Sequence, residues 1–174
     1  MSKSLPIPKT SNPDKLTKTG KPRSAETLRQ LRLAENIKLD FEDGLTSVEI
    51  LAKNPFGFWR HLRLRVPMPP SVNQWTRVWR GKAHASHAAK TYIDCMAKLL
   101  AKAKINPTYD KVKIEVRLYG LPPRSDVDGR NKCLLDALQG LVVFDDVQFR
   151  DQRAVDMNTD IKYGSYCIID LKTL

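Results

Sequence analysis

The sequence predicts an α/β (α+β) protein in which a small mixed sheet packs with helices. Residues 61–66 and 111–119 alternate apolar and polar side chains, which is the period of half-buried strands. Residues 87–104 and 128–141 instead repeat apolar side chains at helical spacing. The length of 174 residues is enough for one such domain and an appendage.

Residues 1–58 predict a basic, partly disordered N-terminal extension, and residues 59–174 predict the main domain. The first 23 residues contain six Lys or Arg, one acid and four prolines. This composition is typical of a flexible cationic arm.

The rest of the extension is expected to form one or two short helices. Ser24 is the predicted N-cap of the first helix, which ends before the acidic turn at 40–44. Thr46 and Glu49 match a capping box and predict a second helix, which stops before Pro55.

The strand at 61–66 is followed by prolines that predict an extended loop over 69–75, leading into a basic segment. Aromatic and basic side chains together can stack on bases and contact phosphates. The predicted DNA contacts here are Asn73, Trp75, Arg77, Arg80 and Lys82. Core packing of Trp75 and Trp79, which are one helical turn apart, is the alternative.

In the helix at 87–104, lysines lie mostly away from the apolar face. His84 and His87 precede or begin this helix, but no paired Cys or further His accompanies them, so a structural or phosphate-facing role is favoured over zinc. The helix is expected to pack on the core with a cationic outer face.

Carboxylates gather after the strand at 111–119. A turn-rich segment delivers Asp126 and Asp128, and Asp128 is the predicted N-cap of the next helix. Lys132 and Asp136 follow at one-turn spacings, so all three can share a helix edge. A capped loop and a simple ion pair are the alternatives. Two basic residues, Arg124 and Arg130, flank these acids as further predicted DNA contacts.

Two more acids, Asp145 and Asp146, follow the apolar run 141–144, which is predicted as a strand or buried turn. Clustered carboxylates are unexpected in a chain of net charge +11. They suggest a divalent cation within a positive surface that attracts phosphate. A metal-dependent nuclease is the first hypothesis, and nucleic acid is the expected partner.

The remaining pattern predicts strands at 149–155 and 166–171, with a turn near 158–160. The three cysteines are far apart and indicate neither a zinc site nor a disulfide framework. No apolar run is long enough to span a bilayer, and the N-terminus lacks the apolar segment of a secretory signal. We expect no membrane association and a cytoplasmic location, either at the nucleoid or in a host cell if a phage encodes the protein.

The acidic segment resembles the signature of the RusA family of Holliday-junction resolvases. The matching residues are Asp126, Asp128, Lys132 and Asp136, then Asp145 and Asp146, with Pro69-Pro70-Ser71-Val72-Asn73 upstream. The resemblance covers roughly residues 60–172. Two positions depart from the family pattern, because Gly129 stands where Asn is usual and Asp156 stands near a usual lysine.

The resemblance implies a small α/β homodimer that binds four-way junction DNA and nicks opposing strands with Mg²⁺, with Mn²⁺ as the alternative metal. It also implies roles for the acids and the lysine. Asp126, Asp128 and Asp146 correspond to the essential triad that holds metal, Lys132 to the essential lysine, and Asp136 and Asp145 to supporting acids. The apolar surface of the last strands could form the core or the dimer interface.

Two other functions stay open. One is a non-catalytic or degenerate protein that binds structured DNA, which the departures at Gly129 and Asp156 favour. The other is a metal-dependent phosphatase or nuclease that acts on other structured DNA.

Overall fold

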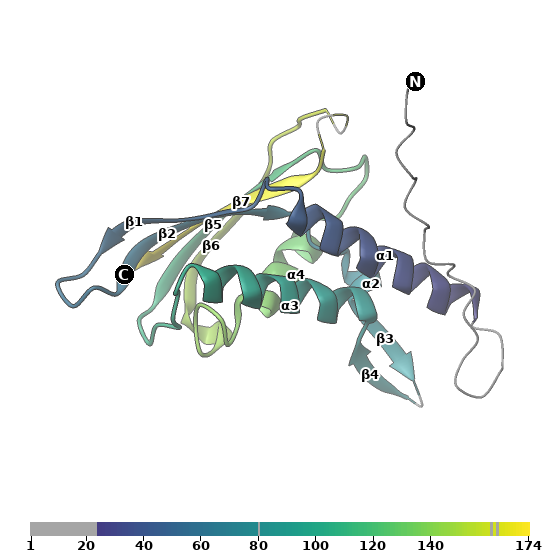
Figure 1. The fold of residues 1–174 in the computed structure, drawn as a ribbon, viewed down its shortest axis with the longest axis horizontal. Coiled ribbons are helices and arrows are strands. Elements are labelled where there is room, and N and C mark those ends of the chain that lie inside the picture. Colours follow the sequence, from purple (N-terminus) through teal and green to yellow (C-terminus); the bar gives the residue numbers. More distant parts are fainter. Residues whose placement is uncertain (1–23, 80, 161, 163) are drawn as a thin grey trace, which may run out of the picture.

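The computed structural model describes residues 24–79, 81–160, 162 and 164–174. The predicted basic arm at 1–23 and Arg80 lie outside the described residues. Figure 1 shows the arrangement of the elements. In order they are α1 (Ala25–Glu42), β1 (Ser47–Lys53), β2 (Trp59–Pro67), α2 (Val72–Trp75), β3 (Thr76–Trp79), β4 (Lys82–Ala85), α3 (His87–Lys102), β5 (Val112–Tyr119), α4 (Val127–Leu138), the 3-10 helix η1 (Asp146–Gln148), β6 (Phe149–Asp156) and β7 (Tyr166–Thr173).

The main sheet has five strands in the order β1-β2-β7-β5-β6. All neighbours are antiparallel except β5 and β6, which are parallel because α4 carries the chain across between them. The predicted α+β class with a mixed sheet is confirmed. Strands β3 and β4 form a separate two-stranded hairpin.

One face of the main sheet packs against the helices (Figure 1). The predicted alternation is confirmed, since Leu62 and Leu64 of β2 and Ile114 and Val116 of β5 are fully buried. These strands therefore place their charged residues on the opposite face, which the helices leave uncovered. Among the described residues, none of the helices has the length and apolar character needed to cross a bilayer.

The predicted helix that starts at Thr46 is wrong, because residues 47–53 form the edge strand β1. The capping-box pattern gives way to antiparallel pairing with β2, which supplies hydrogen bonds to the backbone. Val48 and Ile50 also pack against the core from this strand. The Ser24 cap is confirmed, since its Oγ accepts a hydrogen bond from the Thr27 amide at 3.2 Å.

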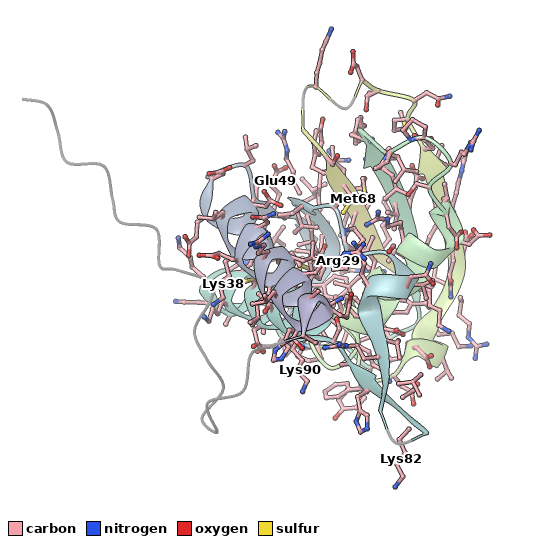
Figure 2. All side chains as sticks on the ribbon, turned by 90° about the vertical axis from the view of Figure 1, so that its right-hand side faces the viewer. Arg29, Lys38, Glu49, Met68, Lys82 and Lys90 are labelled. Carbon is pink, nitrogen blue, oxygen red and sulfur yellow. The ribbon has the colours of Figure 1, made fainter. Side chains whose placement is uncertain are left out.

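The segment predicted as an extended loop over 69–75 is partly helical. Ser71 and Gln74 form a capping box that starts the single turn of α2. The chain then enters the hairpin of β3 and β4, which was not predicted from the sequence. Gly81 has a φ of 72° in the connecting turn, a conformation that favours glycine. Lys82 extends from the hairpin tip (Figure 2).

Tyr92 of α3 links several elements inside the core. Its side chain is fully buried, and its hydroxyl donates a hydrogen bond to the Pro67 carbonyl oxygen at 2.8 Å. The rings of Phe41 and Trp75 approach its ring edge-on, with centroid distances of 5.3 and 6.2 Å. Tyr92 therefore holds α1, α2 and the end of β2 together.

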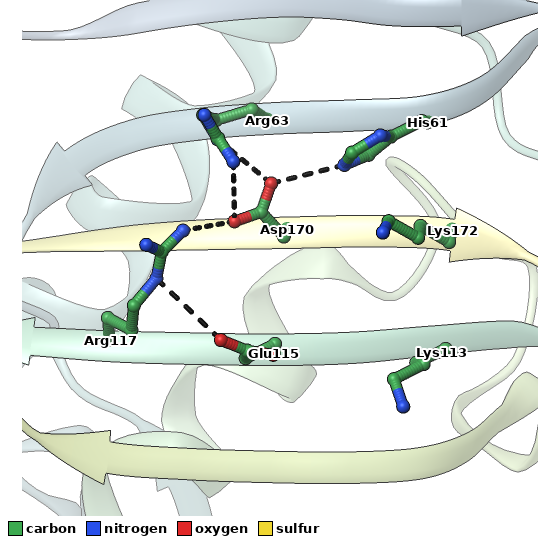
Figure 3. Close-up of a pocket in the computed structure, with 7 residues that line it drawn as sticks. All are labelled: His61, Arg63, Lys113, Glu115, Arg117, Asp170 and Lys172. Atoms are coloured by element: carbon green, nitrogen blue, oxygen red, sulfur yellow. Dashed lines mark hydrogen bonds and ion pairs between the residues drawn. The ribbon is translucent and has the colours of Figure 1, made fainter.

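The uncovered face of the sheet carries a charge network around Asp170 (Figure 3). The Asp170 carboxylate accepts hydrogen bonds from Arg63 at 2.9 and 3.2 Å and from Arg117, and it lies 3.2 Å from His61 Nε2. Its side chain is only 11% exposed. This network lines a cavity of about 260 Å³ on the open face.

Replacing Asp170 with Asn should lower the free energy of unfolding by about 2–3 kcal/mol at neutral pH, because the arginines lose a buried charged acceptor. Burial opposes ionisation of Asp170, but hydrogen bonds from Arg63 and His61 outweigh it and lower the pKa. A lowered pKa stabilises the fold fully above the unfolded-state pKa, and the effect is lost as pH falls through the folded-state value.

Urea unfolding of wild type and of Asp170→Asn, from neutral pH down through the pKa of Asp170 in the folded protein, would measure the effect. The difference between wild type and the Asn variant should shrink as pH falls. Asp151→Asn is the matched control, since Asp151 pairs with Lys113 on the same face but is 55% exposed. A difference that stays constant with pH would contradict the role of the Asp170 charge.

Candidate functional site

The carboxylates of the acidic segment lie at the start of α4. Asp126 is the N-cap and the helix begins at Val127, so the prediction of Asp128 as N-cap is wrong by two residues. The Asp126 side chain makes no capping hydrogen bond, and Asp128 lies in the first turn. Both side chains are exposed. The positive end of the helix dipole favours carboxylates there.

Lys132 lies on an exposed edge of α4 between Asp128 and Asp136. The sequence allowed simple ion pairing along this edge. Among the described residues, however, no carboxylate forms an ion pair with Lys132. Its ammonium is therefore available for a phosphate.

The second pair of acids lies in a tight turn after α4. Val142 and Val143 are buried, so the apolar run before the acids is a buried turn. Asp145 caps η1 by accepting a hydrogen bond from the Val147 amide at 3.3 Å. That bond and a hydrogen bond with Asp146 lower the pKa of Asp145. The hydrogen bond with Asp145 raises the pKa of Asp146, and the charge of Asp136 raises it further.

Asp136 on α4 is thus one of the charges that raise the pKa of Asp146 in the η1 turn, after the larger effects of Asp145 and burial. Among residues 24–160 and 164–174 with their gaps, no group of three or more His, Cys, Asp or Glu side chains is arranged to hold a metal. The predicted ligands Asp126, Asp128 and Asp146 do not form a closed cage in this structure. Their donors are all carboxylate oxygens, which fit magnesium, an ion commonly held by one or two carboxylates and substrate phosphates.

The predicted DNA contacts fall into different environments. Asn73 and Lys82 are exposed. Arg124 is exposed too, at a φ of 60° before α4. Trp75 is buried and packs edge-on against Tyr92, so the alternative of core packing describes it. Arg130 is half-buried and donates a hydrogen bond to the Pro69 carbonyl oxygen, which ties α4 to the proline loop.

Arg77 of the hairpin lines a groove of about 610 Å³ together with His84, His87 and Lys90. The described residues that line this groove include no carboxylate, and none of the described acids forms an ion pair with these four residues. The groove could not be predicted from the sequence, because the hairpin that forms one wall was not predicted. The available sign of this groove was that His84, His87 and Lys90 lie close together in the sequence around the start of α3.

Comparison with known proteins gives a family. No family model matches the chain. The chain is 33% identical over 98 residues to the crossover junction endodeoxyribonuclease RusA of Escherichia coli K12, covering 54% of this chain and 81% of that protein. RusA of Shigella sonnei is 32% identical over 98 residues, with the same coverage. The chain belongs to the RusA family.

Gly129 departs from the RusA family pattern, and the structure gives it a local role. It is buried, and a Cβ added there would lie 2.5 Å from Oδ2 of Asp126. The carboxylate of Asp126 thus occupies the space above the glycine backbone. An Asn at this position would push that carboxylate aside.

Asp156, the second departure from the RusA family pattern, ends β6. Its carboxylate accepts a hydrogen bond from the Asn158 amide at 2.9 Å, and this bond forms the turn after the strand. The acid has a structural role in this turn.

Proposed function

We propose that the protein is an endonuclease that resolves four-way DNA junctions by paired nicks in opposing strands. The observation that carries the proposal is Lys132, which forms no ion pair with any described carboxylate and lies between exposed carboxylates on one helix edge. A lysine held there can contact a phosphate and offset charge that develops on it. Membership of the RusA family supports this chemistry, because the relatives are named crossover junction endodeoxyribonucleases.

Asp126, Asp128 and Asp146 are the proposed ligands of a magnesium ion. When bound, magnesium would supply an activated water and positive charge at the scissile phosphate. Because these exposed carboxylates are not grouped to hold a metal among the described residues, DNA phosphates would supply further ligands to the ion. Asp145 and Asp136 have a supporting role, because both raise the pKa of Asp146.

The hairpin and its groove are the proposed contact for a DNA arm. Arg77, His84, His87 and Lys90 offer positive or titratable groups with no opposing acid in the groove. The net charge of +11 favours binding to the phosphate backbone. Lys82 at the hairpin tip and Arg124 before α4 are exposed and are further proposed phosphate contacts.

A homodimer is part of the proposal. Paired cuts in a junction are related by a two-fold axis, and a C2 dimer reproduces that symmetry. Sedimentation of the free protein and of its junction complex would test this. A complex that contains one protomer and still makes paired cuts would contradict it.

One assay tests the function as a whole. Labelled four-way junction, matched duplex and single strands are incubated with the protein, with and without Mg²⁺. We expect symmetric nicks in the junction only, and only with the metal. Junction binding without nicks would support the non-catalytic alternative, and equal cutting of other structured DNA would contradict junction specificity.

A further inference from the structure

Two exposed aromatic rings stack on each other next to the acidic turn. Tyr109 is 82% exposed and Phe144 is 46% exposed. Their ring centroids are 4.1 Å apart and the ring planes differ by 19°. Phe144 directly precedes Asp145, so the pair lies beside the proposed catalytic site.

The amide of Gln148 fixes the two chain segments that carry these rings. Its Nε2 donates hydrogen bonds to the carbonyl oxygens of Thr108 and Asp110 at 2.8 and 2.9 Å. Its Oε1 accepts hydrogen bonds from the amides of Phe144 and Asp145 at 2.8 and 2.9 Å. Both donor hydrogens and the acceptor oxygen of this side chain are therefore used.

The backbone on either side is held as well. The Thr108 amide donates to the Val142 carbonyl oxygen at 2.9 Å, and Thr108 forms a bridge with Val143. Val142 and Val143 are fully buried. The rings thus stand on a rigid base, so a ligand that stacks on them pays little ordering entropy.

The size of the surface argues against a second protein as the occupant. An aromatic side chain buries at most about 150–250 Å². Two partly exposed rings, even with the neighbouring exposed Val147, fall below the roughly 800 Å² per partner of a stable protein interface. A flat nucleobase, by contrast, matches one aromatic ring in size and stacks on its face.

We propose that Tyr109 and Phe144 form a stacking platform for a nucleobase that leaves the helical stack beside the cleavage point. This inference rests on the proposed function and adds a recognition element to it. A junction offers such bases at its crossover, where duplex stacking is interrupted. Stacking of one base on an aromatic side chain corresponds to roughly 5- to 150-fold in affinity.

The test uses the full-length protein with Tyr109→Ala, Phe144→Ala and the double variant. Tyr109→Phe keeps the ring, and Phe144→Leu keeps apolar bulk without a flat ring. Phe56→Ala is the matched control, because Phe56 is 85% exposed in the turn between β1 and β2. Thermal unfolding of every variant shows whether the fold is kept.

Two DNA measurements are made without Mg²⁺. One is the ratio of affinities for a duplex with a single unpaired base and for the matched duplex. The other is the emission change of 2-aminopurine placed at a junction crossover. We expect the Ala variants to show no emission change and an affinity ratio about tenfold lower than that of wild type. Tyr109→Phe and Phe56→Ala should match wild type in both measurements. Phe144→Leu should resemble Phe144→Ala.

The outcomes separate the platform from the nuclease activity. If wild type cuts junctions and the folded Ala variants keep the ratio and the emission change, the platform is overturned and the proposed function stands. If wild type cuts no junction but the Ala variants lose the ratio, the platform stands and the proposed function fails. Loss of dimer in the Ala variants with unchanged base binding would assign the rings to a contact between protomers and overturn the inference.

Discussion

Replacing Asp128 with Asn is expected to slow junction cleavage by roughly two to three orders of magnitude or more, while junction binding persists. Asn keeps the size of the side chain but removes the negative charge that the proposed magnesium requires. Metal stabilisation of charge in a transition state is worth several kcal/mol, and each 1.36 kcal/mol is tenfold in rate. Asp128 is exposed in the first turn of α4, so the fold should tolerate the change.

Single-turnover cleavage of a labelled junction and a gel-shift assay without Mg²⁺ measure the two effects. Asp94→Asn is the matched control, since Asp94 is an exposed acid on α3 that does not belong to the acidic segment. An Asp128→Asn variant that cuts at the wild-type rate would remove Asp128 from the site. Loss of junction binding in this variant would instead point to a role in holding DNA.

Replacing Tyr92 with Ala is expected to lower the free energy of unfolding by about 3–5 kcal/mol, the range for large aromatic side chains lost from a core. Tyr92 is fully buried, and its hydroxyl is the hydrogen-bond donor to the Pro67 carbonyl oxygen. Tyr92→Phe keeps the ring and removes only this bond, so it should cost about 1–2 kcal/mol.

Urea unfolding followed by circular dichroism gives these free energies. Lys90→Ala is the control, because Lys90 is exposed on the same helix. A loss below about 1 kcal/mol for Tyr92→Ala would mean that the core closes around the cavity and that Tyr92 is not a central support.

The main strands and helices could be predicted because their side chains follow one clear period. Strand β5 alternates buried and half-buried residues over its full length, as the sequence predicts. Strand β1 was missed because its local pattern matches a helix cap, and only pairing with β2 decides its structure. The hairpin of β3 and β4 was missed because its four-residue strands are too short for a period to be recognised.

In the candidate site, too, only contacts between residues close in the sequence could be predicted. Asp128, Lys132 and Asp136 are close in sequence, so helical spacing was enough to place them on one edge of α4. Tyr109 and Phe144 belong to loops far apart in the sequence, which are brought together by the Gln148 hydrogen bonds and by the pairing of Thr108 with Val142 and Val143. No local pattern contains that contact. The distance of Asp146 from the other acids likewise depends on how the turn after α4 packs.

The position of β7 affects how the protein can be made. It follows the other strands in the sequence, yet it lies between β2 and β5 and pairs with both. A ribosome makes the N-terminal part first, so β2 and β5 emerge without their shared neighbour. Until translation has passed Thr173, both strands have an unpaired edge that other chains could join. The sheet therefore stays open between β2 and β5 until β7 has been made, and the exposed edges of these two strands are a risk for aggregation during that interval.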